Sequence, residues 1–351
     1  AFHSTLPNTL CNILSKTNAM KSPITGKEMK LSNEWRAVPY RKEEFTIKYQ
    51  FYLCEESGEQ FTTTALDELN MQMVYNQYRV KHHIPQSDEI KEIRDQYDLS
   101  AVRMGEILGF GPNTYGLYEK GDLPSLPNAN LLKMASDPAK FMTLAKDWNT
   151  ESIKAKEVLL KKIDKLIEER EEDFINFDNY LMGGSEADEF TGYKKPSLEK
   201  LTEMVVYFAH KTPSYKTKMN KLLFYGDFCS FKETGMSISG SKYRAISYGP
   251  VHNKFETLFE HLAERDALDK YYDELPDGGQ IAFLTARTDR PFKKELFSEK
   301  ELEILERVAD KFQEFNTKQI VIESHKELGW LDNQDSRSLI SYHYAIDLKG
   351  I

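Results

Sequence analysis

The sequence predicts an α+β fold that is mostly α-helical. Helical spacing of apolar residues recurs over much of the chain, whereas strict alternation is confined to a short stretch before residue 53. With 351 residues, a formal charge of −9 and 40% hydrophobic residues, the chain suits two or three domains. We expect, in order, an unstructured extension (1–19), a small β ribbon plus a helix (20–84), a five-helix domain (85–148), a charged linker helix with a flexible linker (149–195), and a helix-rich domain with a short β-hairpin (196–351).

The ribbon prediction rests on period-two alternation, which is typical of a strand with one buried face. The apolar positions of this strand are Phe45, Ile47, Tyr49, Phe51 and Leu53. We expect a partner strand near 35–40 and a closing helix near 65–78. Residues 1–19 show neither period, so we assign them no function.

Residues 99–121 predict a helix-turn-helix. Ser100 can cap the first helix, and Gly109 suits the left-handed residue that ends it. Gly111 and Pro112 suit the N-cap and first position of a second helix, which would enter the DNA major groove. The apolar positions that would pack the two helices together are Leu99, Met104, Ile107, Leu108, Tyr115 and Tyr118.

This segment resembles the repressor-type helix-turn-helix of MqsA-type antitoxins, with which it shares the ending Asn-x-x-x-x-Tyr-Glu-Lys-Gly from Asn113. The similarity continues through 124–145, which has a leucine-rich helix and an Asp-Pro break. The resemblance implies a core role for Tyr115 and Tyr118. The predicted DNA-binding residues are Arg103, Asn113, Thr114, Gly116, Leu117 and Lys120. The family commonly has arginine where this chain has Leu117, so a bidentate contact to guanine would be missing.

The charge of this segment leaves an alternative to DNA binding open. Residues 87–150 carry seven basic and ten acidic side chains, whereas DNA-binding domains usually present a basic face. The helix-turn-helix can therefore also be a protein-contact or dimerisation module. Basic side chains just before it, which could assist DNA binding, are Arg79, Lys81, His82 and His83.

The ribbon also resembles the MqsA N-terminal zinc ribbon, which has two cysteine knuckles. At the matching positions this chain has Ser22, Thr25, Cys54 and Ser57. One thiolate cannot supply a tetrahedral structural zinc site, so we expect a ribbon that is packed without metal.

Residues 151–175 are rich in charge and carry a narrow apolar stripe, which predicts a long amphipathic helix. This helix could be a solvated spacer or a helical dimer seam. The run at 183–188 is typical of a flexible linker.

Boundary signals in the last domain predict several helices. Ser197 can cap one helix, Gly235 can end a second, and Ser298 with Glu301 forms a capping box for a third. The sequence Pro-Asp-Gly-Gly at 276–279 predicts a hairpin turn between two short strands.

Two blocks of this domain, 221–251 and 320–330, resemble the signatures of the Panacea domain, also called the SocA-like antitoxin domain. The first has a KLLYFAD-like helix and ends in Tyr-Gly-Pro-Val, and the second is a helix that carries Ser-His-x-Glu and a tryptophan. The resemblance implies a domain that binds and neutralises a toxin encoded beside it. The candidate toxin-binding residues are Lys221, Tyr225, Asp227, Tyr243, Tyr248, His325 and Trp330.

A catalytic alternative for this domain would centre on Ser324, His325 and Glu327. On one helix these residues do not form a nucleophile–base–orienter chain, and no Gly-x-Ser-x-Gly elbow or phosphate loop is present, so we expect no enzyme. Asp227 and Tyr225 could equally form a buried hydrogen-bond network.

The predicted protein is therefore an antitoxin that binds a toxin from its own operon and represses its own promoter. The alternative is a helix-turn-helix regulator whose last domain contacts another protein, without a toxin. No apolar run approaches the ~20 residues that a bilayer requires, and three scattered cysteines favour a reducing cytoplasm. We expect no cofactor and no metal, and leave a homodimer open.

Overall fold

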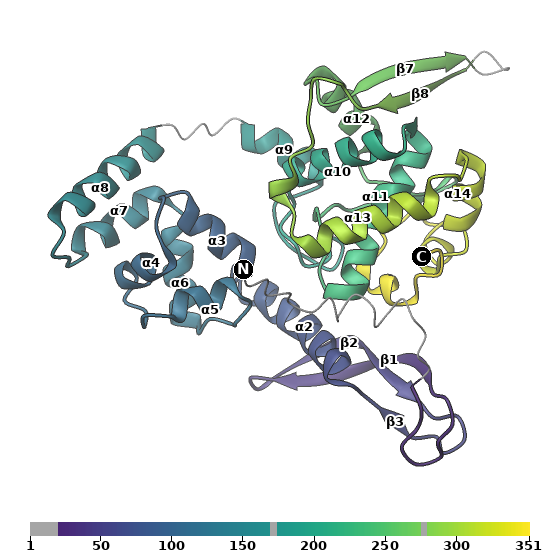
Figure 1. The fold of residues 1–351 in the computed structure, drawn as a ribbon, viewed down its shortest axis with the longest axis horizontal. Helices are drawn as coiled ribbons and strands as arrows, with labels where there is room; N and C mark the ends of the chain where they lie inside the picture. The colour runs from purple at the N-terminus through teal and green to yellow at the C-terminus, as the bar shows by residue number, and fades with distance from the viewer. Residues whose placement is uncertain (1–19, 169–173, 275–278) are drawn as a thin grey trace, which may run out of the picture. The chain divides into compact units, whose positions relative to one another are not determined.

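The computed structural model describes residues 20–168, 174–274 and 279–351. Its elements confirm the predicted α+β, mostly α fold (Figure 1). Backbone contacts divide the chain into two units, one ending at Val74 and one beginning at Tyr75. The extension expected at 1–19, and all but Gly279 of the expected hairpin turn, lie outside the described residues.

The first unit is built on a three-stranded antiparallel sheet of order β1-β2-β3, formed by β1 (Lys30–Tyr40), β2 (Glu43–Leu53) and β3 (Gln60–Phe61). Phe45, Ile47 and Phe51 are buried, as the alternation predicts, but Tyr49 and Leu53 are only partly buried and Gln50 of the opposite face is buried as well. Helix α2 (Thr64–Lys81) starts in this unit. Its Asn70 forms two 2.9 Å hydrogen bonds with the backbone of Gln50, which hold the helix on the sheet.

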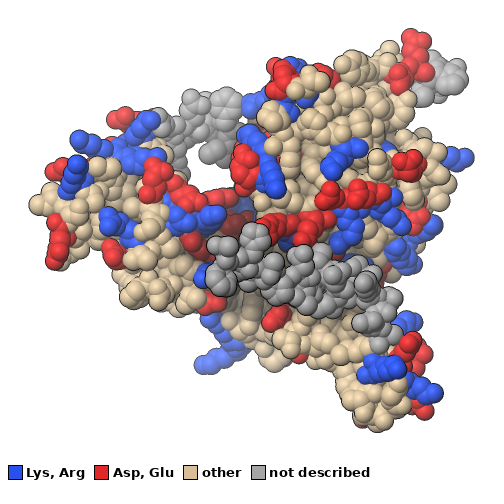
Figure 2. Space-filling view, viewed as in Figure 1, with Lys and Arg blue, Asp and Glu red and all other residues tan. Residues whose placement is uncertain are grey.

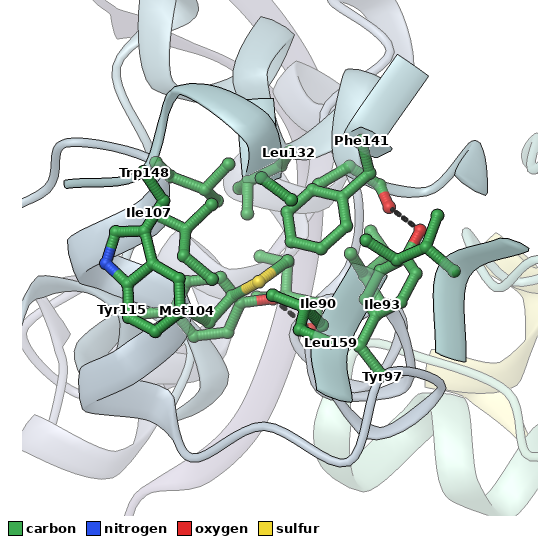
Figure 3. Packing of buried hydrophobic residues seen from close by; sticks show 14 of the residues in the cluster. Ile90, Ile93, Tyr97, Met104, Ile107, Tyr115, Leu132, Phe141, Trp148 and Leu159 are labelled. Carbon is green, nitrogen blue, oxygen red and sulfur yellow. Dashed lines mark hydrogen bonds between the residues drawn. The ribbon is translucent and has the colours of Figure 1, made fainter. Parts of the chain in front are cut away.

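The second unit begins with a helical cluster. It contains the five predicted helices, α3 (Ser87–Asp95), α4 (Ala101–Ile107), α5 (Thr114–Glu119), α6 (Leu126–Ala135) and α7 (Pro138–Asp147). Figure 3 shows their apolar side chains packed into one core. Two buried phenols satisfy backbone carbonyls there: Tyr115 donates to Ile90 at 2.7 Å, and Tyr97 donates to Ala135 at 2.7 Å.

The turn between α4 and α5 differs in part from the prediction. Ser100 caps α4 and Gly109 is left-handed at φ +71°, as expected. However, α5 begins at Thr114 with Asn113 as its N-cap, so the prediction that Gly111 and Pro112 open this helix is wrong. The Gly111 carbonyl accepts from the Thr114 amide at 3.0 Å, which places Pro112 inside the turn.

Helix α8 (Ile153–Glu168) packs on this cluster through Leu159 and Ile163, which belong to the same core. The buried side of the apolar stripe on α8 is thus covered by helices of the same chain. The two roles expected for this helix, a solvated spacer and a dimer seam, did not include this contact. Ile153 and Val158 remain exposed. Helix α9 (Phe174–Met182) follows.

The remaining helices surround α11 (Lys216–Thr234), in which every residue from 218 to 231 is buried. The other helices of this C-terminal domain are α10 (Leu198–Lys211), α12 (Phe255–Glu264), α13 (Glu299–Phe312), α14 (Thr317–Ser324), α15 (Leu328–Leu331), and the 3₁₀ turns η1 (Lys294–Leu296) and η2 (Tyr342–Asp347). The predicted caps at Ser197 and Ser298 are confirmed, and Gly235 ends α11 at φ +74°.

Two small antiparallel sheets complete the domain. One pairs β5 (Tyr243–Ile246) with β6 (Gly249–His252), and the other has the order β4-β8-β7, with β4 (Ser214–Tyr215), β7 (Asp269–Glu274) and β8 (Gln280–Thr285). None of the described helices combines the length and the apolar content that crossing a bilayer requires.

Candidate functional site

The centre of the C-terminal domain contains a carboxylate with four hydrogen-bond donors. Asp227, fully buried on α11, accepts from the amides of Ile238 (2.9 Å) and Ser239 (2.8 Å). Its second oxygen accepts from the hydroxyls of Ser239 (2.6 Å) and Tyr243 (2.7 Å). Burial raises the pKa of Asp227, and the hydrogen bonds act in the opposite direction. These hydrogen bonds hold residues 238–243, which connect α11 to β5, against α11.

A second buried carboxylate connects the end of the described chain to this core. Glu327 accepts from the Tyr225 hydroxyl (3.0 Å) and from the amides of Gly350 (2.8 Å) and Lys349 (2.9 Å). Burial, and then the Glu327 charge, raise the pKa of Tyr225. The geometry of Asp227 and Tyr225 therefore fits the buried network considered for them from the sequence.

Glu327 also explains why residues 320–330 do not form one helix, as predicted. Helix α14 ends at Ser324, with His325 as its C-cap, and Glu327 is the N-cap of α15. The break turns the Glu327 carboxylate toward the two backbone amides of residues 349 and 350. The single-helix prediction is wrong because these long-range hydrogen bonds lie outside local helical periodicity.

Lys221 lies beneath the hairpin of β5 and β6. Its ammonium is fully buried and donates to the Pro250 carbonyl at 2.8 Å. Burial lowers the pKa of Lys221 to about 7. The hairpin approaches so closely that a Cβ on Gly249 (φ +91°) would lie 2.4 Å from Ser324 Oγ and 2.8 Å from Lys221 Cε. Only glycine fits at this position without movement of its neighbours.

His325 and Trp330 clamp the second block onto the same hairpin. Their rings stack with centroids 3.8 Å apart and an interplanar angle of 8°. Trp330 Nε1 donates to the Ile246 carbonyl at 2.7 Å. Burial, and then the neighbouring Lys221, lower the pKa of His325, which favours a neutral ring at pH 7. The hairpin turn beside this pair presents Tyr248, which is 69% exposed.

The seven predicted toxin-binding residues thus divide into interior and surface positions. Lys221, Tyr225, Asp227 and Tyr243 have no exposed surface, so they support the domain from inside. Trp330 is buried, with 8% of its surface exposed, and His325 is half-buried, whereas Tyr248 is exposed to solvent. A direct contact between any of them and a toxin stays a prediction.

Ser324, His325 and Glu327 are not joined into a catalytic chain among the residues that the structure describes. Ser324 Oγ donates to the Val321 carbonyl of its own helix at 2.9 Å. His325 stacks on Trp330, and Glu327 holds Tyr225 and the backbone near residue 350. The Ser324 hydroxyl and the Glu327 carboxylate are therefore occupied by structural hydrogen bonds, whereas Nε2 of the stacked His325 ring is buried without a hydrogen-bond partner among the described residues.

The predicted DNA-binding residues share the α4–α5 region but differ in exposure. Asn113, Leu117 and Lys120 are exposed, and Thr114 and Gly116 are partly buried. Arg103 is exposed and lies over the Trp148 ring, 5.4 Å from its centroid. Acidic and basic side chains are interspersed over this part of the surface in Figure 2.

Two arginines near α5 are already engaged. Arg94 forms 2.6 Å ion pairs with Glu119 and Asp95. Arg79 was predicted as one of the basic residues that could assist DNA binding. It is 2% exposed and donates to the carbonyls of Pro85, Gly121 and Asp122. Arg79 therefore holds the turn after α5 instead of facing outward.

In the first unit, the four positions matched to zinc knuckles converge. Thr25 Oγ1 lies 3.3 Å from Cys54 Sγ. Hydrogen bonds from Ser57, Thr25 and Ser22 lower the pKa of Cys54 to about 6. Tight turns form both loops, since Gly26 donates to Ser22 and Gly58 donates to Cys54. The arrangement offers one sulfur and three hydroxyls, which is a poor donor set for structural zinc.

An ion pair between a buried carboxylate and a partly exposed arginine was not predicted from the sequence. Glu203 on α10 is fully buried, and it pairs with Arg290 at 2.6 Å while accepting from the Lys293 amide at 3.1 Å. An available signal was its place between Leu201 and Val205, which share the buried face of the helix.

Residues 219–331, from within α11 to the end of α15, match the family model described as "Antitoxin SocA-like, Panacea domain". This match confirms the resemblance predicted for the C-terminal blocks, while the zinc ribbon and the DNA-binding helix-turn-helix stay predictions. No curated protein and no solved structure matches the chain significantly. The similarity to the SocA-like Panacea antitoxin domain therefore extends over residues 219–331, about a third of the chain.

Proposed function

We propose that this chain is an antitoxin that neutralises a protein toxin by stoichiometric binding through its C-terminal domain. The observation that carries the proposal is the antitoxin-family match over residues 219–331. Its two motif blocks pack on each other around the buried Asp227 and Glu327 networks. A rigid domain of this kind can hold a binding surface in place without performing chemistry.

The surface that we propose for the toxin surrounds the turn at Tyr248. Tyrosine is enriched at interface centres because it buries a large area at low entropic cost. Tyr248 is 69% exposed, Ile322 of the second block is 51% exposed, and Leu331, which directly follows that block, is 41% exposed. The His325–Trp330 stack supports this region from beneath.

Co-expression tests the proposal directly. The neighbouring open reading frame is expressed alone and then with the full chain, and growth is scored by colony counts. We expect the neighbour to arrest growth and the chain to restore it. The C-terminal domain alone should also rescue. A fragment beginning near residue 186 is the suitable one, because Tyr193 bonds His343 and the Thr191 carbonyl accepts from Ser237.

We also propose that the α4–α5 segment binds the promoter of the same operon. The support is its resemblance to repressor-type domains, together with the exposure of Asn113 and Leu117. The alternative, a regulator without a toxin, predicts a promoter mobility shift but no growth arrest when the neighbouring open reading frame is expressed alone. Mixed charge over this segment keeps a protein-contact role as the outcome if no shift occurs at low salt.

A further inference from the structure

Strand β7 ends its sheet with an unpaired edge. The sheet order is β4-β8-β7, and among the described strands β7 pairs with β8 alone, over six consecutive residue pairs from Asp269↔Thr285 to Glu274↔Gln280. Every second backbone N–H and C=O of an edge strand points away from its neighbour. Figure 1 shows this hairpin at the periphery of the C-terminal domain, beside α12.

This edge lacks part of the usual protection against pairing with another strand. Natural edges are blunted by proline, by bulges or by charged side chains, above all lysine. The acidic residues of β7 leave it open mainly to a strand of opposite charge. The strand sequence DKYYDE has no proline, and its pairing with β8 has no bulge. Its one lysine, Lys270, is drawn back against Glu260 of α12 and lies over the Tyr272 ring, 5.1 Å from the centroid.

Two neighbouring tyrosines flank the open edge. Tyr271 is 57% exposed and Tyr272 is 52% exposed. Since consecutive residues of a strand point to opposite faces, one ring lies on each side of the sheet. An added strand would therefore find a large aromatic side chain on both of its faces. The hairpin behind them is anchored, because Leu284 of β8 is fully buried.

The charge of the strand indicates the kind of partner. The strand carries three carboxylates, Asp269, Asp273 and Glu274, and one base, Lys270, whose ammonium is paired with Glu260. Asp269 pairs with Arg287, and Asp273 accepts from the Tyr215 hydroxyl at 2.7 Å. Because Arg287 also pairs with Asp266 and Asp289, the surroundings of the strand remain acidic overall. Acidic side chains also gather at the outer end of this hairpin in Figure 2. A symmetric antiparallel pairing of two copies centred between the tyrosines would set Asp269 opposite Glu274, which is destabilising, and Lys270 opposite Asp273, which is stabilising. Such a pairing would also bring together two strands that each carry an excess of carboxylates, whereas a basic strand from another protein would meet that excess with opposite charge. The edge thus favours a basic strand from another protein over a second copy.

We infer that β7 is a strand-addition site, at which a basic, extended segment of the toxin continues the β4-β8-β7 sheet. The inference rests on the proposed antitoxin function, and it adds a second contact region to the Tyr248 surface. Main-chain hydrogen bonds would supply affinity, and the two tyrosines with the flanking carboxylates would select the side chains of the partner.

Hydrogen exchange on the full chain provides the first test. The probe is the protein encoded beside its gene, purified with the chain as a complex. Amides of residues 269–274 should exchange at least tenfold more slowly in the complex than in the free chain, because an added strand occupies the outward N–H groups. Unchanged exchange over this strand in a stable complex would overturn the inference. Concentration-dependent protection in the free chain would assign the edge to a second copy and overturn it too.

A charge-reversal variant gives the second test. Glu274→Lys should lower rescue at least tenfold in colony counts, because the changed strand repels a basic partner; Asp273 is left in place because it holds the Tyr215 hydroxyl. The matched control is Glu56→Lys, at an exposed residue of the first unit, which makes the same change in net charge. If wild type rescues and both variants rescue equally, the inference is wrong while the antitoxin proposal stands. If wild type itself fails to rescue, the antitoxin proposal is the one that fails.

Discussion

The pH dependence of folding should change when Lys221 is replaced by methionine. Methionine keeps a long apolar side chain in the buried site but removes the titrating ammonium. Burial lowers the pKa of Lys221 to about 7, whereas a lysine in the unfolded chain keeps its ordinary value of 10.5. Between these values the unfolded chain binds a proton that the folded chain does not. The free energy of unfolding therefore rises with pH as the folded lysine loses its charge.

The size of this rise follows from the two pKa values. Each pH unit over which the difference is fully expressed contributes about 1.4 kcal/mol. Because the folded lysine is half-charged near pH 7, wild type should gain about 2 kcal/mol from this group between about pH 7 and about pH 9. In Lys221→Met that gain is absent. The variant also loses the donor to the Pro250 carbonyl, which changes its free energy of unfolding by a constant amount that does not depend on pH.

Urea unfolding of the full chain at several pH values measures the difference. Trp330 reports on this domain, and a background with Trp35→Phe and Trp148→Phe removes the other two tryptophans. Groups that titrate alike in both proteins cancel when the two curves are subtracted. The comparison runs from pH 7 upward, above the range in which His325, whose pKa is lowered by Lys221, changes its charge. Parallel curves for wild type and Lys221→Met would refute the burial of an ionisable ammonium beneath the hairpin.

Three further outcomes are expected. Gly249→Ala should destabilise the C-terminal domain by about 2 kcal/mol or more in thermal melts, because strain at φ +91° adds to the collision with Ser324. Gly58→Ala, at φ +73° and with no neighbour within 4 Å, shows the cost of backbone strain alone when the unfolding of its own unit is followed, and equal losses of free energy would contradict the collision. Elemental analysis should find no stoichiometric zinc in wild type and about one zinc per chain once cysteines replace Ser22, Thr25 and Ser57; zinc in wild type, or none in the variant, would contradict the knuckle assignment. On promoter DNA, Asn113→Ala should weaken binding by about one to two orders of magnitude, and Leu117→Arg should tighten binding and steepen its salt dependence, while toxin rescue stays unchanged. If neither wild type nor Leu117→Arg shifts the promoter in a mobility-shift titration at low salt, this segment is a protein-contact module.

Local chemistry predicted much of this fold because several elements are determined by residues close in sequence. The caps at Ser100, Ser197 and Ser298 act within three residues, so a sequence pattern contains the whole interaction. The alternation in β2 is equally local. The break at Glu327 is different, since its partners are Tyr225 and the backbone near residue 350, far away along the chain.

The candidate site was predicted less well for the same reason. Helical spacing cannot distinguish a polar residue on the surface from one that is buried with its partners. Lys221 and Asp227 were therefore predicted as contact residues, although both lie inside the domain. Tyr248 shows the opposite case, because a turn places its residues at the surface without help from distant contacts.

The complete burial of α11 between residues 218 and 231 has a consequence for how such a protein can diversify. A helix enclosed on all sides has no face on which a change is free, so drift along it is limited by packing and by the buried hydrogen bonds of its polar residues. Under the proposed function, new partner preferences would arise at exposed positions that can vary without disturbing this helix, such as the turn at Tyr248 or the outer strand at Tyr271. The most recognisable part of the sequence and the part that chooses the partner would thus evolve at different rates.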